Sequence, residues 1–398
     1  MEHQRQHKLF LVVTIVSLLS FIILCQSQYL NLELALPFKF TTSVQKNNRF
    51  ILSSRVKTRA EHLLMLKTLI QNRFIGTREQ KLLYGLWMGD AFSDMLDVEL
   101  QNSKKSYIES NLYSVNLTGQ QQKDRSKRNI LCQLKEEALL RTLTGTEKPF
   151  DSLKWYKHVP RQPLERLPNV PYNTCAVVSS AGSILNSLLG EEIDSHDAVL
   201  RFNAAPTVGY EKDVGSKTAF RLINSQILAQ PEFNFTLSPL YKNVTLVAWD
   251  PAPYSGNLEK WYKKPDFDLF GPYVKHRKHF PAQPFYILHP DFLWNLWKII
   301  QSNTEENIQP NPPSSGFTGI ILMMSLCHHV HAYEFIPSHR HANLCHYFEK
   351  TRNLGCTFGQ YHPLLYEKLL IRRITNSSVE DLATKGRVSL SGFSQITC

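Results

Sequence analysis

The segment GQYHPLLYEK, residues 359–368, places a histidine and a carboxylate within one short stretch near the end of the chain. His362 has an ordinary pKa of about 6.5, which suits a group that takes up a proton near neutral pH. Pro363 disfavours a helical conformation at His362 and is well suited to the first position of a helix. Glu367 then lies in that helix, where it can orient the imidazole ring or accept a backbone N–H. A proton-transfer site, a metal site and an ordinary surface turn all fit this segment.

A turn of small residues follows the strand-like run CAVVSS (175–180). The chain continues as AGSILNSLLG, whose apolar spacing predicts a helix that ends at Gly190. In such a strand–turn–helix unit, backbone N–H groups near Ser180 can bind a phosphate at the helix N-terminus. The turn has neither the G-x-G-x-x-G spacing nor a P-loop sequence, so an ordinary connection is the alternative interpretation.

Two asparagines end the next strand-like runs. Asn203 closes DAVLRFN (197–203), and Asn224 closes TAFRLIN (218–224). Side chains at the carboxyl ends of neighbouring parallel strands face the crevice in which α/β proteins bind ligands. Either asparagine alone fits a turn residue that caps its own loop. Both together, after the turn at Ser180, favour a pocket for a nucleotide or a sugar.

The segment NPPSSGFTGIILMM (311–324) predicts a second anion site. Its prolines end the preceding segment, Ser314 or Ser315 can cap the helix that follows, and Gly316 lets the backbone approach a ligand closely. The plainer interpretation is a simple N-cap before a buried helix. The two interpretations are compatible, because a capped helix N-terminus also attracts a carboxylate.

Two stretches have the composition of metal sites. The segment 327–350 contains six histidines and two cysteines, but neither C-x-x-C nor H-E-x-x-H, so we expect no metal there. PDFDLF (265–270) contains Asp266-x-Asp268, the pattern with which many sugar transferases hold Mn²⁺ on a nucleotide diphosphate. A solvated acidic loop is the alternative for this pattern.

The order of the remaining elements predicts the fold class. From about residue 131, short apolar runs alternate with helical patterns. We expect further strands at 244–250, 284–289 and 332–337, and helices at 291–302 and 316–330. This alternation predicts an α/β fold, with a mostly parallel sheet flanked by helices and ligands bound at the carboxyl ends of its strands.

The N-terminal region predicts a membrane anchor. Residues 9–25 carry no charge, and Arg5 and Lys8 precede them, so we expect a transmembrane signal anchor with residues 1–8 in the cytosol. A cleaved signal peptide is the alternative. The rest of the chain would then be lumenal.

Residues 26–130 have the composition of a stem, with helical spacing over 59–74, and residues 131–398 form the expected folded domain. The stem contains RSKR at 125–128. This sequence is either a solvated basic segment or a dibasic signal for secretory convertases, whose cleavage would release the domain beyond it.

The composition narrows the class of protein. Hydrophobic residues make up 42% and aromatic residues 11%, which is enough for a core and excludes wholesale disorder. The net charge of +11 fits a solvated basic surface, an anionic ligand or an anionic membrane. Nucleic acid is disfavoured, because no zinc-finger spacing, basic heptad or RRM-type motif is present.

Two further features fit an oxidising lumen. Candidate N-glycosylation sequons occur at Asn116, Asn234, Asn243 and Asn376. Of the seven cysteines, one lies in the expected span, which leaves an even number for disulfides. Six cysteines allow 15 pairings, and these spacings alone do not select one.

Four segments together resemble the sialylmotifs of animal sialyltransferases. Residues 175–226 resemble the large motif, 311–335 the small motif, HYFE (346–349) the third motif and HPLLYE (362–367) the very small H-x-x-x-x-E motif. They occur in the family's order and cover the chain from about residue 130 to its end. CAVVSSAGS, DAVLRFN, PSSG and YHPLLYEK are most similar to the β-galactoside α-2,6-sialyltransferases, and the compact stem is more similar to type 1 than to type 2.

This resemblance implies a variant of the GT-A (Rossmann-like) fold and a metal-independent, inverting reaction. Sialic acid would pass from CMP-sialic acid to the 6-hydroxyl of terminal galactose in Galβ1-4GlcNAc on the N-glycans of glycoproteins. No cofactor is implied besides the donor substrate. The resemblance also implies a single-pass type II protein of the Golgi membrane with a lumenal catalytic domain. The resemblance is also compatible with a released soluble form and with a homodimer.

Carried onto this chain, the resemblance assigns roles to individual residues. His362 would be the general base. The CMP-sialic acid site would contain Ser180, Asn203, Asn224, Ser315, Gly316, His346 and Thr357. The acceptor side would contain Asp266, Glu349, Tyr361 and Lys368. The implied disulfides are Cys132–Cys398, Cys175–Cys327 and Cys345–Cys356.

One residue departs from the family pattern. Phe267 stands where this subfamily is expected to have a tyrosine, so one hydroxyl contact to the acceptor would be missing. Three alternatives to the implied reaction are a sialyltransferase of other linkage or acceptor, a metal-dependent transferase that uses Asp266 and Asp268, and a non-catalytic lumenal glycan-binding protein.

Overall fold

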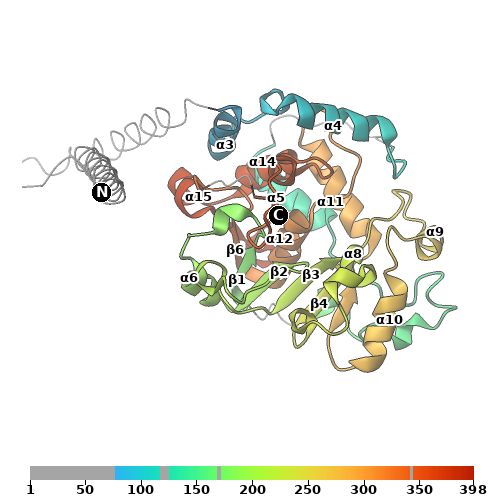
Figure 1. Ribbon diagram of the computed structural model, residues 1–398. Helices are drawn as coiled ribbons and strands as arrows, with labels where there is room; N and C mark the ends of the chain where they lie inside the picture. Colours follow the sequence, from blue (N-terminus) through green and yellow to red (C-terminus); the bar gives the residue numbers. More distant parts are fainter. Residues whose placement is uncertain (1–76, 117–124, 168–171, 341–343) are drawn as a thin grey trace, which may run out of the picture. The chain divides into compact units, whose positions relative to one another are not determined.

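Seven strands form one sheet in the part of the chain that this computed structural model describes, residues 77–116, 125–167, 172–340 and 344–398 (Figure 1). Their order across the sheet is β5-β4-β3-β2-β1-β6-β7, and the described neighbours are parallel except β6 and β7. The strands are β1 (Tyr172–Val178), β2 (Ala198–Phe202), β3 (Phe220–Asn224), β4 (Thr245–Trp249), β5 (Phe285–Ile287), β6 (Cys327–Tyr333) and β7 (Arg387–Ser391). The predicted α/β class with a mostly parallel sheet is confirmed.

Both faces of the sheet are buried, because alternate residues of each strand point to opposite sides. Val177 of β1 packs in the hydrophobic cluster on one face, whereas Ala176 packs in a cluster on the other. In β4, Val247 and Leu246 divide between the two faces in the same way. This burial explains why the strands are nearly continuous apolar runs in the sequence.

One face of the sheet is covered by a layer of longer helices (Figure 1). The centre of this layer is α12 (Ser315–Leu326), which is buried along Phe317–Met324 and is therefore apolar on all sides. Around it lie α5 (Lys127–Glu137), α11 (Pro290–Ser302) and α14 (Leu364–Ile374).

The other face is covered by shorter helices. Those that carry residues of the clusters on this face are α6 (Gly190–Asp194), α7 (Glu211–Val214), α8 (Ser225–Ala229), α9 (Leu258–Lys263) and α10 (Phe270–His279). Two further short helices follow in the chain, α13 (Gly355–Phe358) and α15 (Val379–Lys385).

The helix predicted from residue 181 to Gly190 is wrong. The chain after β1 forms only a short 3₁₀ turn, Gly182–Ile184, and the next helix, α6, begins at Gly190. The intervening loop is held by Asp213, whose carboxylate accepts the backbone N–H groups of Asn186 and Leu188, both at 2.9 Å. Asn186 and Leu188 have positive φ angles, which a continuous helix does not allow. The Ser180 turn therefore does not open an α-helix.

The helix predicted over 316–330 ends earlier, at Leu326. Residues from Cys327 to Tyr333 form β6, which pairs with β1 on one side and β7 on the other. Of the predicted strand at 332–337, only Ala332 and Tyr333 belong to a strand, and that strand starts five residues sooner. Pairing with two neighbouring strands overrides the helical pattern here, and the sequence reading missed β7, which supplies one of them.

The boundary between stem and folded domain lies before residue 130. Two helices of the expected stem, α3 (Arg78–Met88) and α4 (Val98–Ser110), pack on the sheet domain. Leu86 and Trp87 of α3 are fully buried in the main hydrophobic cluster, and the Trp87 indole N–H donates to the Pro337 carbonyl at 2.8 Å. In the sequence, the only sign of folded structure in this stretch is the amphipathic spacing of short helices. The polar composition of the stretch therefore led to its assignment to the stem.

The three expected disulfides are all present. Cys132–Cys398 joins α5 to the last residue of the chain, with Cα atoms 5.6 Å apart. Cys175–Cys327 joins β1 to the start of β6, and Cys345–Cys356 closes a short loop. Their Cα separations of 6.2 and 5.2 Å lie in the normal range for a disulfide.

Some expectations concern residues outside the described ranges, namely the anchor (9–25), the cytosolic tail (1–8) and the helical spacing at 59–74. Within the described ranges, no helix combines the length and apolar character that a membrane crossing requires. The four sequon asparagines are described, and each lies at an exposed position.

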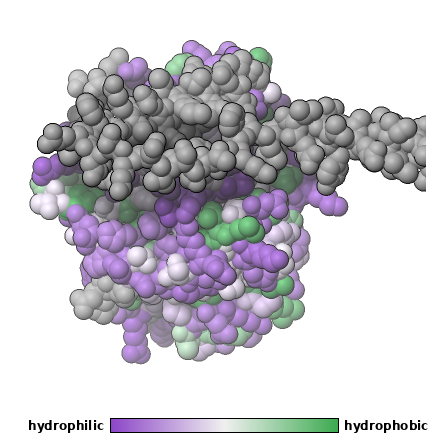
Figure 2. Space-filling model, turned by 90° about the vertical axis from the view of Figure 1, so that its left-hand side faces the viewer, coloured by the Kyte–Doolittle hydropathy of each residue, from purple (hydrophilic) through white to green (hydrophobic). Residues whose placement is uncertain are grey.

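The view in Figure 2 shows a mostly hydrophilic surface on the described residues, with small separate hydrophobic areas. The large apolar side chains with the highest exposed fractions, such as Val208 and Leu188, are spread along the chain. Isolated exposed apolar residues of this kind are normal on folded domains.

Candidate active site

A polar cavity lies at the carboxyl ends of the central strands. The residues after β1 and those ending β2, β3 and β4 contribute to its wall, as do the N-terminus of α12 and the start of α14. All seven residues expected at the donor site line this cavity together with His362: Ser180, Asn203, Asn224, Ser315, Gly316, His346 and Thr357. The structure thus brings together residues that are up to 182 positions apart in sequence.

A second cavity adjoins the first and shares three lining residues with it, Asn224, Trp249 and His362. Asp266 and Tyr361, expected on the acceptor side, line this second cavity. Phe267 lines it as well, so the residue that departs from the family pattern faces the same space. The imidazole of His362 therefore borders both cavities.

The His362 ring is held in one tautomer by the backbone. Its Nδ1 atom lies 2.7 Å from the carbonyl oxygen of Pro312. A carbonyl oxygen can only accept a hydrogen bond, so Nδ1 carries the proton and Nε2 keeps a free lone pair. That arrangement suits a group that takes a proton from a ligand.

Burial keeps the His362 ring neutral. Desolvation lowers its pKa to about 4, and the hydrogen bond to Pro312 opposes this shift only in part. The ring is therefore unprotonated at mildly acidic to neutral pH. A bound anion in the neighbouring cavity would raise the pKa again, because it stabilises the imidazolium form.

Glu367 does not orient the histidine ring but holds the start of α12. Its carboxylate accepts the Ser314 backbone N–H at 2.8 Å and the Ser314 hydroxyl at 2.5 Å. Ser314 in turn caps α12 by accepting the Phe317 N–H at 3.1 Å. The expected N-cap is therefore Ser314, and Ser315 is the first helical residue. Burial raises the pKa of the Glu367 carboxyl, and the two hydrogen bonds from Ser314 oppose that shift.

Trp249 is a site residue that the sequence reading missed. It ends β4, and its indole N–H donates to the Ser315 hydroxyl at 2.9 Å. Its ring also lies beside the His362 ring, with centroids 6.2 Å apart. The sequence signal that could have identified it is a tryptophan at the carboxyl end of a predicted buried strand, where ligands bind in such folds.

The two asparagines are linked to each other. The Asn203 side-chain oxygen accepts the Asn224 backbone N–H at 3.0 Å, and Asn203 has a positive φ of 45°. The Asn224 side-chain oxygen is buried and has no hydrogen-bond partner among the described residues. Because buried polar atoms are normally paired, this oxygen is open to a ligand in the cavities that Asn224 lines.

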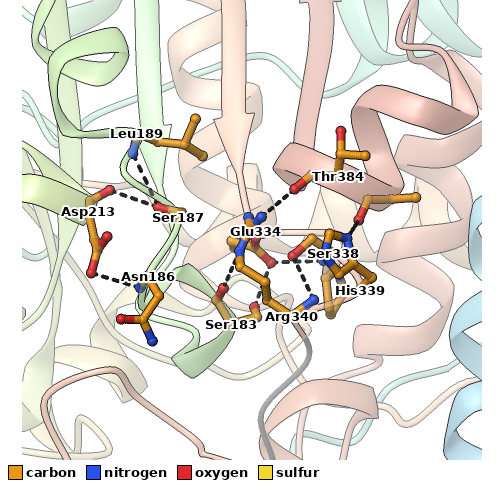
Figure 3. A network of polar contacts seen from close by, with 12 residues as sticks. Ser183, Asn186, Ser187, Leu189, Asp213, Glu334, Ser338, His339, Arg340 and Thr384 are labelled. Atoms are coloured by element: carbon orange, nitrogen blue, oxygen red, sulfur yellow. Dashed lines mark hydrogen bonds and ion pairs between the residues drawn. The ribbon is translucent and has the colours of Figure 1, made fainter. Parts of the chain in front are cut away.

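Glu334, just after β6, organises the wall of the first cavity from behind (Figure 3). Its buried carboxylate accepts the Ser183 hydroxyl at 2.5 Å, the Ser338 N–H at 2.9 Å and the Arg340 guanidinium at 2.8 Å. Its φ is +57°, which is unusual for a residue with a side chain and is stabilised by these contacts. The network joins the turn after β1 to the segment after β6.

Two residues expected on the acceptor side lie elsewhere. Lys368 is buried, lines the first cavity and donates to the Phe335 carbonyl. Burial lowers the pKa of its amine, and the carboxylates of Glu367 and Glu334 oppose that shift. Glu349 lines neither cavity and accepts a hydrogen bond at 2.8 Å from the His346 ring.

The wall of the second cavity and the residues packed behind it include residues from the expected stem. Tyr113, in the segment after α4, lines the second cavity and has its hydroxyl 2.5 Å from that of Tyr361. Tyr107 of α4 contacts the Tyr361 ring edge to face, with centroids 5.4 Å apart. The sequence reading missed both because it placed this stretch outside the folded domain.

The candidate metal motifs do not converge. Asp268 accepts the Gly271 N–H at 3.1 Å, whereas Asp266 faces the second cavity. In the described ranges, no cluster of three or more histidine, cysteine, aspartate or glutamate side chains is arranged to hold a metal ion.

A crevice at the carboxyl ends of a parallel sheet, with a neutral histidine between two adjoining cavities, is the arrangement of a group-transfer enzyme. The model of glycosyltransferase family 29 (sialyltransferase) matches residues 117–379, and this chain belongs to that family.

Relatives named beta-galactoside alpha-2,6-sialyltransferase 2 are similar over most of the chain. The protein of Pan troglodytes is 56% identical over 327 residues, which cover 82% of this chain and 62% of that protein. The protein of Bos taurus is 57% identical, covering 82% and 66%. The chain thus spans about 62% of the length of the first of these relatives. Their type 2 name differs from the type 1 likeness expected from the stem.

A solved structure titled as that of a mammalian sialyltransferase aligns with 69% of this chain and 81% of its own, at 20% identity and a TM-score of 0.35.

Proposed function

We propose that this protein transfers sialic acid from CMP-sialic acid to the 6-hydroxyl of terminal galactose in Galβ1-4GlcNAc on N-glycans. Membership of the sialyltransferase family and the names of the similar proteins support this reaction class. The observation that carries the proposal is the position of His362 in the wall common to two adjoining cavities, because a transferase needs its base between donor and acceptor.

The first cavity is proposed as the donor site. The backbone and hydroxyl groups at the N-terminus of α12 offer donors and a positive dipole end for the phosphate and the sialic acid carboxylate. The unpaired Asn224 oxygen offers an acceptor for a ligand N–H or O–H. Ser180, Asn203, His346 and Thr357 complete this proposed site.

The second cavity is proposed as the acceptor site. Tyr361 and Phe267 provide rings against which the apolar face of a sugar packs, and Asp266 provides an acceptor for sugar hydroxyls. Glu349 and Lys368, which lie outside this cavity, are not part of the proposed acceptor site.

In the proposed step, Nε2 of His362 takes the proton of the galactose 6-hydroxyl as its oxygen attacks the anomeric carbon of sialic acid. The new bond forms on the face opposite the leaving group, so the configuration inverts. The bond from the anomeric carbon to the phosphate oxygen breaks, and its electron pair leaves with CMP. A monophosphate develops less charge than a diphosphate, so the helix N-terminus and neighbouring side-chain donors can stabilise it without a metal ion.

We further propose that the chain is a single-pass type II protein of the Golgi membrane, anchored by residues 9–25, with glycoproteins as its partners. The uncharged segment at residues 9–25 and the three disulfides support this location. The proposal includes a variant GT-A architecture for the sheet domain.

One assay tests the function. The lumenal fragment is incubated with CMP-sialic acid and N-acetyllactosamine, with and without EDTA, and the linkage of the product is determined. We expect an α-2,6-linked product that EDTA does not reduce. No transfer would favour a glycan-binding protein without catalysis, loss of transfer in EDTA would favour a metal-dependent enzyme, and another linkage would contradict the proposed acceptor hydroxyl.

A further inference from the structure

A buried carboxylate behind the second cavity has no role in the reaction described above. Asp250 directly follows β4 and is only 1% exposed. Its neighbour Trp249 points its indole N–H to Ser315 in the first cavity. Because successive side chains at a strand end point in opposite directions, Asp250 points away from that hydroxyl.

The Asp250 carboxylate accepts hydrogen bonds from three chain segments. The Trp261 indole N–H of α9 donates to Oδ2 at 2.7 Å, and the Ser225 hydroxyl at the start of α8 also donates. The backbone N–H groups of Asp266 and Phe267 donate at 3.1 and 3.4 Å. One carboxylate therefore fixes two consecutive residues of the loop between α9 and α10.

Those two residues line the second cavity, and the loop that carries them runs between the buried residues Trp261 and Leu269. Asp266 is exposed and Phe267 is half-buried, whereas Asp250, Trp261 and Ser225 are all buried. The buried partners form a rigid base on which the exposed loop rests. The two hydrogen bonds to Asp250 thus hold the backbone of Asp266 and Phe267 beside the second cavity.

We propose that Asp250 is a positioning residue that holds Asp266 and Phe267 in the wall of the second cavity and thereby sets the affinity for the sugar acceptor. The effect on acceptor affinity rests on the proposed function. The claim that Asp250 holds the loop in place does not rest on it. Asp250 itself lines neither cavity and touches no reacting group.

The protonation state of Asp250 gives the inference a pH signature. Burial raises the pKa of its carboxyl to about 6, and the four donors that face it oppose this shift. Only the carboxylate can accept all four, because the protonated form replaces one acceptor site with a donor. Lowering the pH through about 6 is therefore expected to loosen the loop. The other titratable groups that interact with this region are the Asp266 carboxyl and the hydroxyls of Tyr113 and Tyr361.

The test compares Asp250→Asn with a matched control, Asp194→Asn. Asp194 also accepts two consecutive backbone N–H groups, those of Ser216 and Lys217, but lines neither cavity. In Asp250→Asn we expect the KM for N-acetyllactosamine to rise by about tenfold or more, because hydrogen bonds to a charged acceptor are lost. The KM for CMP-sialic acid is expected to stay within about twofold. Asp194→Asn is expected to change neither KM.

Hydrogen exchange provides a readout that needs no activity. In Asp250→Asn the amides of Asp266 and Phe267 are expected to exchange faster than in the wild type, and in Asp194→Asn they are not. Wild-type acceptor KM is expected to rise as the pH falls from 7 to 5, and Asp250→Asn is expected to lack this component.

Unchanged exchange at both amides, or an equal rise of both KM values, would overturn the inference. If Asp250→Asn does not fold, the wild-type pH profile decides, since a flat acceptor KM between pH 7 and 5 would equally overturn it. If the wild type transfers no sialic acid, the proposed function fails, while the exchange of these two amides still tests whether Asp250 holds the loop.

Discussion

The Nδ1 atom of His362 lies 2.7 Å from the carbonyl oxygen of Pro312, two residues before the cap of α12. Five residues further along the chain, Glu367 bonds the cap itself, Ser314. The segment that carries His362 and the helix N-terminus of the first cavity are therefore joined at two points. This double connection explains the spacing between His362 and Glu367, since one turn of α14 separates the two contacts.

Replacing His362 with alanine is expected to remove most turnover and to leave CMP binding largely intact. Loss of a general base costs roughly 10²–10⁴-fold in rate. His362→Asn is the matched variant, because its Nδ2 amide takes the place of Nδ1 and can still donate to the Pro312 carbonyl, but it cannot take a proton. Both variants are measured for kcat and, by calorimetry, for CMP affinity. Wild-type-like turnover in either would refute the base assignment.

Ser314 and Glu367 are expected to depend on each other for their contributions to stability, and loss of their contact is expected to lower the free energy of unfolding. Glu367→Gln replaces the buried carboxylate that accepts both Ser314 hydrogen bonds with a neutral amide, and a hydrogen bond to a charged group contributes about 1.5–3 kcal/mol. In a double-mutant cycle with Ser314→Ala, we expect a coupling energy of roughly 0.5–3 kcal/mol from denaturant unfolding.

The control for this cycle is Glu259→Gln, which removes the exposed ion pair with Lys263 on α9. Exposed pairs of this kind contribute little, so the unfolding midpoint is expected to change little. Additive effects of the Ser314 and Glu367 substitutions would show that the contact does not stabilise the start of α12.

Trp249→Phe is expected to weaken donor binding while it preserves the ring beside His362. The substitution removes only the indole N–H that bonds Ser315, and a neutral hydrogen bond contributes about 1 kcal/mol. The KM for CMP-sialic acid is therefore expected to rise about fivefold. Combining it with Ser315→Ala is expected to add little further, because the single variants remove the same bond. Fully additive effects in steady-state kinetics would contradict this account.

The sheet could be predicted from sequence because both of its faces are buried. Strands such as Ala198–Phe202 and Thr245–Trp249 are short apolar runs between polar turns, and this signal is local. The errors arose where long-range contacts decide the structure. The loop at Asn186 depends on Asp213, and the strand from Cys327 depends on pairing with two neighbours.

For a related reason, the residues expected at the donor site all line one cavity, whereas those expected on the acceptor side are divided between different places. Ser180, Asn203 and Ser315 lie within the motifs that carry the family resemblance, at the ends of elements that the sequence marks. Tyr113 comes from outside those motifs, and its proximity to Tyr361 depends on how α4 packs. Lys368 lines the first cavity and not the second, and sequence alone does not reveal which side of α14 is buried.

Acidification is expected to destabilise the domain through a buried histidine pair. The His196 and His331 rings are joined by a 2.8 Å hydrogen bond, and burial, followed by the neighbouring His196, lowers the pKa of His331 to about 4. Arg387 and His329 lower it further and Glu192 opposes them. Between about pH 6.5 and 4 the unfolded chain binds a proton at this histidine and the folded chain does not, so stability falls as the pH falls.

Thermal unfolding at pH 7.5 and pH 5.0 measures this effect. The wild-type Tm is expected to drop more than that of His331→Gln, which keeps a polar side chain but cannot take up the proton. His279 lies at an exposed position on α10, so the Tm of His279→Gln is expected to fall by as much as that of the wild type. An identical drop in all three proteins would exclude the buried pair as the cause.

The folded domain is expected to resist cleavage at RSKR. Ser126 caps α5 and accepts the Asn129 N–H at 3.2 Å, and the residues that follow, Lys127 and Arg128, are helical. The Lys127 amine also donates to the Thr375 carbonyl at 2.8 Å. A protease needs an extended segment, so this site must unfold locally before it can be cut.

Incubation with a dibasic convertase, followed by mass spectrometry, checks this expectation. Native protein is expected to stay intact, whereas the reduced and unfolded chain is cut after Arg128. The variant Arg128→Ala, unfolded in the same way, controls for cleavage elsewhere. Native protein cut at the rate of the unfolded chain would instead support the convertase-signal interpretation of this sequence. It would also mean that α5 opens readily at its N-terminus, although Cys132 ties the same helix to Cys398.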